Sequence, residues 1–219
     1  MLVVAKDIHK YYGDLHVLKG VDVEIKKGEI VSIVGASGAG KSTLLHILGT
    51  LDEADQGSLL VDNIDLSGLK GDKLAAFRNA KIGFIFQFHN LLPEFTAEEN
   101  IIIPGLIAGG KENSLKVRAA ELADLLGIGP RLQHKPSELS GGEQQRVAVA
   151  RALINNPTVI FADEPSGNLD THSSQSLHEL FFRLRDEFGQ SFVIVTHNQS
   201  LAQMSDRMLT MKDGKILLQ

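Results

Sequence analysis

The stretch that decides the fold is Gly35-Ala36-Ser37-Gly38-Ala39-Gly40-Lys41-Ser42, which directly follows the apolar run Ile30–Val34. Glycines in this pattern let backbone N–H groups close around phosphate oxygens, and the helix predicted over residues 42–49 points its positive end at the same anion. In such a loop, the lysine reaches the β and γ phosphates of a nucleotide and the serine hydroxyl ligates Mg²⁺. A flexible glycine-rich turn is the alternative, but a turn needs neither a buried strand before it nor a helix after it. The candidate phosphate-binding residues are therefore Gly35, Ala36, Ser37, Gly38, Ala39, Gly40, Lys41, Ser42 and Thr43.

The composition excludes several classes of protein. With 219 residues, of which 43% are hydrophobic and 22% charged, the chain can bury a sizeable core and is not disordered, collagen-like or a coiled coil. Its net charge of −5 offers no basic footprint, so nucleic acid is not the expected partner. Cysteine is absent, which removes disulfides, thiolate catalysis and cysteine-ligated metals.

No segment of the sequence suits the membrane directly. The longest apolar stretch, residues 101–108, contains Pro104 and is far shorter than the roughly 20 residues of a spanning helix. The amino terminus reaches Lys6 and Asp7 too early for a signal peptide. Any membrane role is therefore expected to come through a partner.

Hydrophobic patterning predicts an α/β fold in one domain, residues 1–219. Three continuous apolar runs suit parallel strands that are buried on both faces: Ile30–Val34, 159–162 and 192–195. Residues 17–25 alternate instead, which suits an N-terminal antiparallel β subdomain that also contains residues 2–8 and 58–62. Helices are predicted at about residues 98–108, 114–126, 141–154 and 171–188, so a helical subdomain at about 90–156 is expected to interrupt the mainly parallel core sheet.

The buried runs end in polar residues at what is predicted to be one edge of the sheet. Open α/β sheets bind their ligands beyond the carboxyl ends of the strands. Asp163 is expected to hold Mg²⁺, usually through water, because this small cation keeps part of its hydration shell. Glu164 is then free to act as general base on an attacking water. An acidic pair alone would suit a solvated turn, so this interpretation depends on the phosphate loop.

Two further side chains are placed near this edge by the same reasoning. His197 follows the third buried run and is expected to donate a hydrogen bond to the γ-phosphate, although a lone histidine is more often structural or exposed. Gln87 follows residues 81–86 and is expected to offer its amide oxygen to Mg²⁺ or to water. Without these neighbours, a surface amide would be the ordinary interpretation of this glutamine.

A second helix start has the character of an anion-binding end. Leu139-Ser140-Gly141-Gly142-Glu143 opens a helix with small residues and unpaired N–H groups. With the phosphate loop, Gln87, Asp163-Glu164, Ser166-Gly167-Asn168-Leu169-Asp170 and His197 in this order, the sequence resembles the ABC-transporter ATPase family over essentially all its length.

The resemblance implies a P-loop NTPase core that binds ATP and Mg²⁺ and works as a head-to-tail homodimer. In that family each ATP lies between the phosphate loop of one copy and the Leu-Ser-Gly-Gly segment of the other. Ser140, Gly141 and Gly142 would therefore contact the partner's γ-phosphate, and Asp170 would reach across the same interface. Tyr12 matches the aromatic position that stacks on adenine; the adjacent Tyr11, or a tyrosine with a core or surface role, is the alternative.

A narrower resemblance comes from residues 83–100, which are similar to the lipoprotein-releasing and MacB-type members of this family. Ser166 stands where threonine is more usual in that group, which preserves the hydroxyl. The resemblance implies that the region from Gln87 to Phe95 docks a cytoplasmic helix of a membrane subunit; an apolar loop packed on the core is the alternative. Its possible anchors are Phe88, Leu91, Leu92 and Phe95.

The function implied is an ATP-hydrolysing subunit at the cytoplasmic face of the inner membrane, attached through its membrane subunits. Lipoprotein release is the leading expectation. Peptide, drug or lipid export of the MacB type, and mechanotransmission of the FtsE type in cell division, remain open. A P-loop kinase or GTPase fits poorly, because no Asn-Lys-x-Asp motif is present and the Leu139 segment has no role there.

Overall fold

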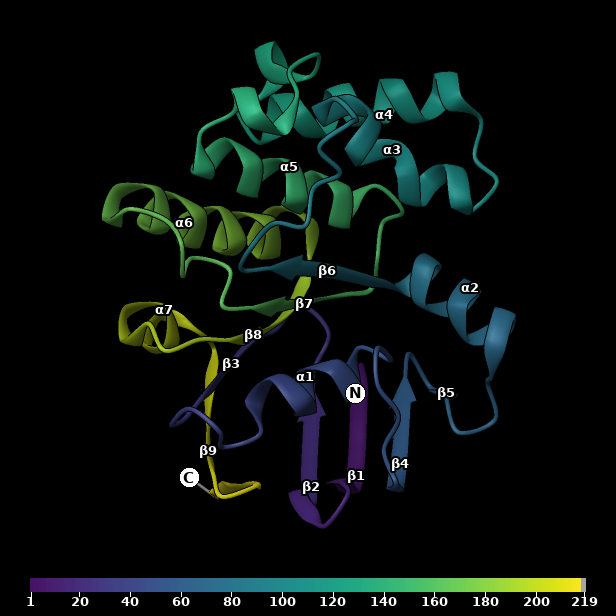
Figure 1. Ribbon diagram of the computed structural model, residues 1–219, viewed down its shortest axis with the longest axis vertical. Helices are drawn as coiled ribbons and strands as arrows, with labels where there is room; N and C mark the ends of the chain where they lie inside the picture. Colours follow the sequence, from purple (N-terminus) through teal and green to yellow (C-terminus); the bar gives the residue numbers. More distant parts are fainter. Residues whose placement is uncertain (218–219) are drawn as a thin grey trace.

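The computed structural model describes residues 1–217 and contains two β-sheets with helices packed between and around them (Figure 1). Within these residues, sheet A is antiparallel with strand order β2-β1-β4-β5. Sheet B has the order β10-β9-β3-β8-β7-β6 and is parallel except for the pairing of β9 with β10. The predicted α/β class, with a mainly parallel sheet and an N-terminal antiparallel sheet, is confirmed.

The strands of sheet A are β1 (Val3–Tyr12), β2 (Leu15–Ile25), β4 (Gln56–Val61) and β5 (Ile64–Asp65). Those of sheet B are β3 (Ile30–Val34), β6 (Ile82–Phe86), β7 (Val159–Asp163), β8 (Ser191–Val195), β9 (Arg207–Lys212) and β10 (Lys215–Leu217). The α-helices are α1 (Lys41–Leu48), α2 (Gly71–Lys81), α3 (Ala97–Ile107), α4 (Glu112–Leu125), α5 (Gly141–Leu153), α6 (Thr171–Phe188) and α7 (Gln199–Met204). Two short 3₁₀ turns are η1 (Gly129–Arg131) and η2 (Pro136–Glu138).

Sheet B separates two hydrophobic cores, which explains why its central strands β3, β7 and β8 are apolar at most positions. On β3, Ile30 belongs to the core shared with α3 to α6, whereas Val31 and Ile33 belong to the core shared with α1 and sheet A. On β8, Phe192 and Val193 divide in the same way. Side chains of a strand point alternately to the two faces, so two buried faces favour apolar residues at successive positions.

The predicted helices agree with the structure to within two residues at each end, and capping explains the boundaries of α3 and α6. α3 starts after Thr96, whose hydroxyl accepts the Glu99 N–H in a capping box. α6 starts after Asp170 and ends at Gly189, which has a φ of 65°. Four elements were not predicted from the sequence, because their hydrophobic periodicity is weak: α2, α7, β9 and β10.

The helices α3, α4 and α5 occupy the chain between β6 and β7 and lie together at the top of Figure 1. They cover one face of sheet B, while α1 lies between sheet B and sheet A (Figure 1). Among residues 1–217, no helix combines the length and apolar character that a bilayer span requires.

Candidate functional site

The strand order of sheet B brings the predicted site residues to one edge. β3, β8, β7 and β6 are parallel neighbours, so the residues that follow them emerge side by side. These are the loop from Gly35, then Thr196 and His197, then Glu164, and finally Gln87. Parallel pairing therefore gathers segments that lie far apart in the sequence, such as Gly35 and His197.

The phosphate loop fits tightly against β9, and this explains two of its glycines. A Cβ on Gly35 would lie 2.2 Å from the Met211 carbonyl oxygen, closer than atoms can approach. Gly40 has a φ of 100°, and a Cβ there would lie 3.0 Å from the side chains of Leu18 and Met211. Only glycine is compatible with this backbone path.

The end of the phosphate loop carries positive charge and can bind an anion. Lys41 donates from Nζ to the carbonyl oxygens of Gly35 at 2.9 Å and Ala36 at 3.1 Å, which holds the ammonium over the loop. Gly40 precedes α1 without a side-chain cap, so the first N–H groups of that helix remain available to a ligand. Together these groups suit a polyphosphate.

Ser42 and Asp163 form the oxygen pair expected at a magnesium site. Ser42 Oγ donates to Asp163 Oδ1 at 3.1 Å, although 121 residues separate them. Burial raises the pKa of the Asp163 carboxyl above its usual value. His46 Nε2 lies 3.8 Å from Asp163 Oδ2. Sequence reasoning missed His46, although its spacing of four residues from Ser42 places both on one helix face.

Glu164 and His197 hold each other directly. His197 Nδ1 lies 2.8 Å from Glu164 Oε2, and its backbone N–H donates to the same oxygen at 3.2 Å. Glu164 has a φ of 45°, a left-handed conformation that is costly for a non-glycine residue, and its N–H donates to the Val195 carbonyl. The carboxylate is thereby fixed at the sheet edge, with the largely exposed His197 ring beside it.

Gln87 lies at the same edge, but its amide contacts the loop after β7 rather than Ser42 or Asp163. Its Nε2 donates to Asn168 Oδ1 at 3.1 Å, and Asn168 Nδ2 donates to the Gln87 carbonyl at 3.2 Å. Sequence reasoning gave Asn168 no partner. Because Gln87 and Asn168 are 81 positions apart, no local sequence pattern indicates that they pair.

The amino end of α5, residues 140–142, is called the Ser140 end. It faces solvent and has different neighbours from the phosphate loop. Ser140 and Gly141 are exposed, and the residues from other segments that lie beside Gly141 and Gly142 include His89, Leu169 and Ser173. Ser140 caps α5 in a capping box with Glu143, and Ser140 Oγ also donates to Glu143 Oε2 at 2.9 Å.

The surroundings of Glu143 strongly favour its ionised form. The backbone N–H of Ser140, then Arg131 Nε at 2.7 Å and the Ser140 hydroxyl, lower the pKa of Glu143 to about 2. The Glu143 carboxylate therefore stays ionised at the positive end of α5. Its contacts with Ser140 order the start of this helix.

Asp170 caps α6 in the single chain. Its Oδ1 accepts the Ser173 N–H at 2.9 Å and its Oδ2 accepts the Ser173 hydroxyl at 2.6 Å. Gly142 also lies against Ser173. The carboxylate predicted to reach a second copy is thus fixed beside the Ser140 end.

The two tyrosines differ in their surroundings. Tyr11 stacks on His16 with the ring centroids 4.1 Å apart, which covers one of its faces. Tyr12 is 52% exposed, and its hydroxyl donates to Asp52 Oδ2 at 2.6 Å, a hydrogen bond that raises the pKa of Tyr12. The Thr43 hydroxyl interacts with the same phenol, so Tyr12 lies beside the start of α1.

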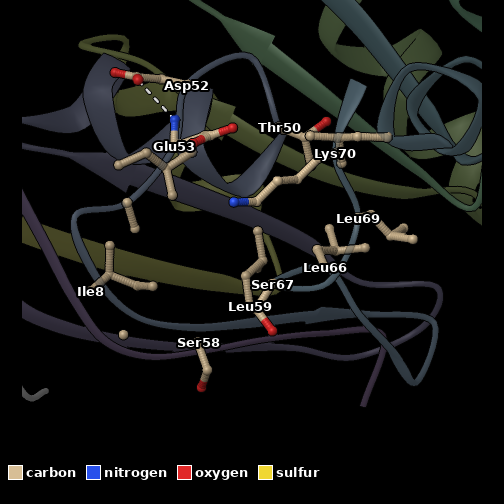
Figure 2. A pocket seen from close by; sticks show the side chains of 14 residues that line it. Ile8, Thr50, Asp52, Glu53, Ser58, Leu59, Leu66, Ser67, Leu69 and Lys70 are labelled. Carbon is tan, nitrogen blue, oxygen red and sulfur yellow. Dashed lines mark hydrogen bonds between the residues drawn. The ribbon is translucent and has the colours of Figure 1, made fainter. Parts of the chain in front are cut away.

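A pocket of about 270 Å³ near Asp52 is separate from the phosphate edge (Figure 2). It lies between α1, β4 and the segment before α2, and Figure 2 shows Asp52 accepting the Glu53 N–H at its rim. Its floor includes Ile8, Leu59 and Leu66. None of the residues predicted to bind a ligand lines this pocket.

The four predicted docking anchors differ in exposure. Leu91 is partly buried and packs against the core shared with α3 to α6. Phe88, Leu92 and Phe95 are exposed by 75%, 43% and 41%. Their loop borders a groove of about 460 Å³ that is lined by Phe86, Asn90, Pro104, Ile107 and Arg151, among others.

Comparison with known proteins identifies the protein family that has this fold and these site residues. The sequence model described as ABC transporter matches residues 18–167, and the chain belongs to this family. It is an ATPase of the family and binds ATP.

Particular relatives are named for one transport system. The chain is 59% identical over 215 residues to the lipoprotein-releasing system ATP-binding protein LolD of Bacteroides thetaiotaomicron, covering 98% of this chain and 99% of the relative. It is 57% identical over 216 residues to LolD of Cytophaga hutchinsonii, covering 99% of each. The narrower resemblance seen in the sequence is confirmed.

Solved structures agree with the fold. A dimeric structure of the bacterial ABC transporter cassette MJ0796 matches with a TM-score of 0.91 and 40% identity, covering 99% of this chain and 97% of that chain. A second dimeric structure of that cassette, described as a post-hydrolysis state bound to ADP and Pi, matches with a TM-score of 0.88 and 39% identity, with the same coverage.

Proposed function

We propose that two copies of this chain close around two ATP molecules and hydrolyse them to drive the membrane subunits of a lipoprotein-releasing transporter. The observation that carries the proposal is the separation of two anion-binding ends. The loop from Gly35 lies at the edge of sheet B, whereas Ser140 faces solvent among other neighbours. A second copy that supplies its Ser140 end would complete each site.

The residues at the sheet edge fit the roles predicted for them. Lys41 and the first N–H groups of α1 would bind the phosphates, and Ser42 and Asp163 would supply the hard oxygens that hold Mg²⁺. When bound, Mg²⁺ would neutralise charge on the β and γ phosphates. Gln87 would add its amide oxygen once it is released from Asn168.

Glu164 has the position and environment of a general base. The ring nitrogen Nδ1 and the backbone N–H of His197 both contact Glu164 Oε2. This leaves Glu164 Oε1 to accept a proton from the attacking water. With Nδ1 turned to Glu164, His197 presents Nε2 to the γ-phosphate. His197 would thus orient the base and contact the phosphate with one ring.

Tyr12 is the better adenine platform of the two tyrosines. One face of Tyr11 is covered by His16, whereas the ring of Tyr12 is fixed by Asp52 beside Thr43 at the start of α1. A ring held through its hydroxyl can stack on adenine with little further loss of entropy.

The helical part, residues 90–156, would carry movement to the membrane subunits. Ser140 to Gly142 contact the partner's γ-phosphate in the closed dimer, Asp170 lies at the same interface, and hydrolysis removes the contact that favours closure. The groove beside Phe88 and Ile107 would receive a cytoplasmic helix of a membrane subunit, since both side chains are more than 70% exposed.

The identity of the cargo rests on the relatives. Both curated relatives described above are named as the ATP-binding protein of a lipoprotein-releasing system, and each match covers nearly the whole chain. By this similarity, the chain would sit at the cytoplasmic face of the inner membrane through its membrane subunits.

Trapping the closed dimer tests the shared site. Glu164→Gln should keep ATP binding, abolish turnover and elute as a dimer from size-exclusion chromatography with ATP and Mg²⁺. A variant that hydrolyses ATP at the wild-type rate would remove the base assignment, and one that binds ATP only as a single chain would refute the shared site.

A mixed dimer provides the matched control. Ser140→Arg and Lys41→Ala should each be inactive alone, but a dimer of one with the other retains one complete site, which should still bind ATP.

Vesicles that contain the protein with its membrane subunits should release a lipoprotein on addition of ATP. ATPase stimulation without release would refute the cargo assignment.

A further inference from the structure

One buried histidine joins the Gln87 loop to the amino end of α5. His89 is 6% exposed, and its Nε2 lies 3.0 Å from the carbonyl oxygen of Gly141, 52 residues further along the chain. A carbonyl oxygen can only accept, so this contact is a hydrogen bond in the tautomer that carries its hydrogen on Nε2. The contact therefore links a loop of the sheet edge to the segment that faces a second copy.

The same ring also faces Gln87. Its Nδ1 lies 3.2 Å from the Gln87 carbonyl oxygen. Burial, with a smaller contribution from Arg151, lowers the pKa of His89 and favours the neutral ring, which has a single N–H. The shorter contact, to Gly141, takes that hydrogen.

Arg151 holds the loop at a second point on α5. Its guanidinium donates to the carbonyl oxygens of His89 and Asn90, both at 2.6 Å. Arg151 lies ten positions beyond Gly141, which is about 15 Å along the helix axis. His89 and Asn90 have φ values of 63° and 50°, so their left-handed backbone depends on these contacts.

Gln87 is held on its other side by the loop after Glu164. Its side chain contacts Asn168, and a Cβ on Gly167 would lie 2.9 Å from Gln87 Nε2. A nucleotide that draws Gln87 away from Asn168 would therefore move a loop whose next attachment is α5.

We infer that His89 is a positioning residue that makes Gln87 and the Ser140 end move as one body, so that nucleotide held by one copy orients the segment offered to the other. The inference deepens the proposed function and rests on it, because the Ser140 end acts only on a second copy. Nothing in the chemistry of hydrolysis itself requires His89, which distinguishes it from Glu164 and His197.

Three substitutions separate the hydrogen bond from the shape of the ring. His89→Gln keeps an N–H near the position of Nε2, His89→Leu fills similar space without a donor, and His89→Asn is polar but too short to reach Gly141. Dimerisation with ATP and Mg²⁺ is measured in the Glu164→Gln background. The kcat and KM for ATP hydrolysis are measured with Glu164 intact, and thermal unfolding reports folding.

We expect His89→Leu and His89→Asn to raise the protein concentration for half-dimerisation about fivefold and to lower kcat by a similar factor. Fivefold corresponds to about 1 kcal/mol, the size of one net hydrogen bond. ATP affinity of the single chain and KM should stay within about twofold of the parent, and His89→Gln should recover dimerisation and kcat.

Parent-like behaviour of all three variants would overturn the inference, as would a His89→Gln variant impaired as strongly as His89→Leu, since the ring would then only fill space. Loss of ATP affinity in the single chain as large as the loss of dimerisation would overturn it too. If the Glu164→Gln parent forms no dimer, the proposed function itself fails and the inference falls with it. A normal parent dimer with indifferent variants refutes the inference alone.

Discussion

The carboxylate of Glu143 should contribute about 2 kcal/mol to folding stability, and two substitutions separate the contribution of its charge from that of its hydrogen bonds to Ser140. Glu143 accepts hydrogen bonds from the Ser140 N–H at 2.8 Å, the Ser140 hydroxyl at 2.9 Å and Arg131 Nε at 2.7 Å. Glu143→Ala removes the cap and the charge. Glu143→Gln keeps an acceptor for Ser140 but loses the ionic interaction with Arg131.

The magnitude follows from the pKa of this carboxyl. A fall from 4.5 to about 2 sets an upper limit of about 3.4 kcal/mol, at 1.36 kcal/mol per pH unit. The Glu143 side chain is 27% exposed and that of Arg131 46%, so solvent screens the pair and the limit is reduced by about half. We expect a cost of about 2 kcal/mol for Glu143→Ala, which also loses the cap, and about 1 kcal/mol for Glu143→Gln.

Thermal unfolding of the nucleotide-free protein measures both variants. At 2–4 °C per kcal/mol for a chain of this size, Tm should fall by about 4–8 °C for Glu143→Ala and about 2–4 °C for Glu143→Gln. Glu187→Gln is the control, because Glu187 forms an exposed i,i+4 pair with Arg183 and should change Tm by less than about 1 °C.

The pH dependence has a defined sign. The folded pKa of Glu143 lies below its unfolded value, so this stabilisation is complete above pH 4.5 and disappears as the pH falls towards about 2. The difference between wild type and Glu143→Gln should therefore be constant from pH 7 to pH 5 and shrink below pH 4.5. A difference that vanishes between pH 7 and pH 6, or a Glu143→Ala variant with the wild-type Tm, would refute the reasoning.

Three further predictions concern the phosphate loop, the adenine platform and a buried histidine. Gly35→Ala should destabilise the protein by about 3 kcal/mol in urea unfolding, because its Cβ would lie 2.2 Å from the Met211 carbonyl oxygen; Gly68→Ala, at an open position, is the control. Tyr12→Ala should weaken ATP binding about tenfold in a fluorescence titration, whereas Tyr12→Phe, which keeps the ring and loses only the Asp52 contact, should stay within about threefold; equal losses would contradict stacking. Burial lowers the pKa of His178, so its folded state resists protonation and stability falls as the pH drops below 6.5; His178→Met should flatten this fall between pH 6.5 and 5, and an unchanged slope would show that other groups cause it.

Much of the fold and the individual motifs could be predicted from the sequence because they depend on contiguous residues. Apart from Ser32, Ile30–Val34 and 192–195 are apolar because two cores face them, and Thr96 and Ser140 cap helices through residues three positions away. Strands such as β9, with only partial burial, leave no such pattern and were not predicted.

The sequence by itself determined what each segment is able to do: the loop before Lys41 can bind phosphate, Asp163 can hold a cation and Glu164 can accept a proton. Tertiary structure alone decided which side chains hold one another, as in Ser42 with Asp163, Gln87 with Asn168, Tyr12 with Asp52, and His89 with Gly141. The physical reason is that local conformation and residue chemistry are properties of short stretches of chain, whereas a hydrogen bond between residues 40 to 121 positions apart exists only after the packing of sheets and helices has fixed both partners within about 3 Å.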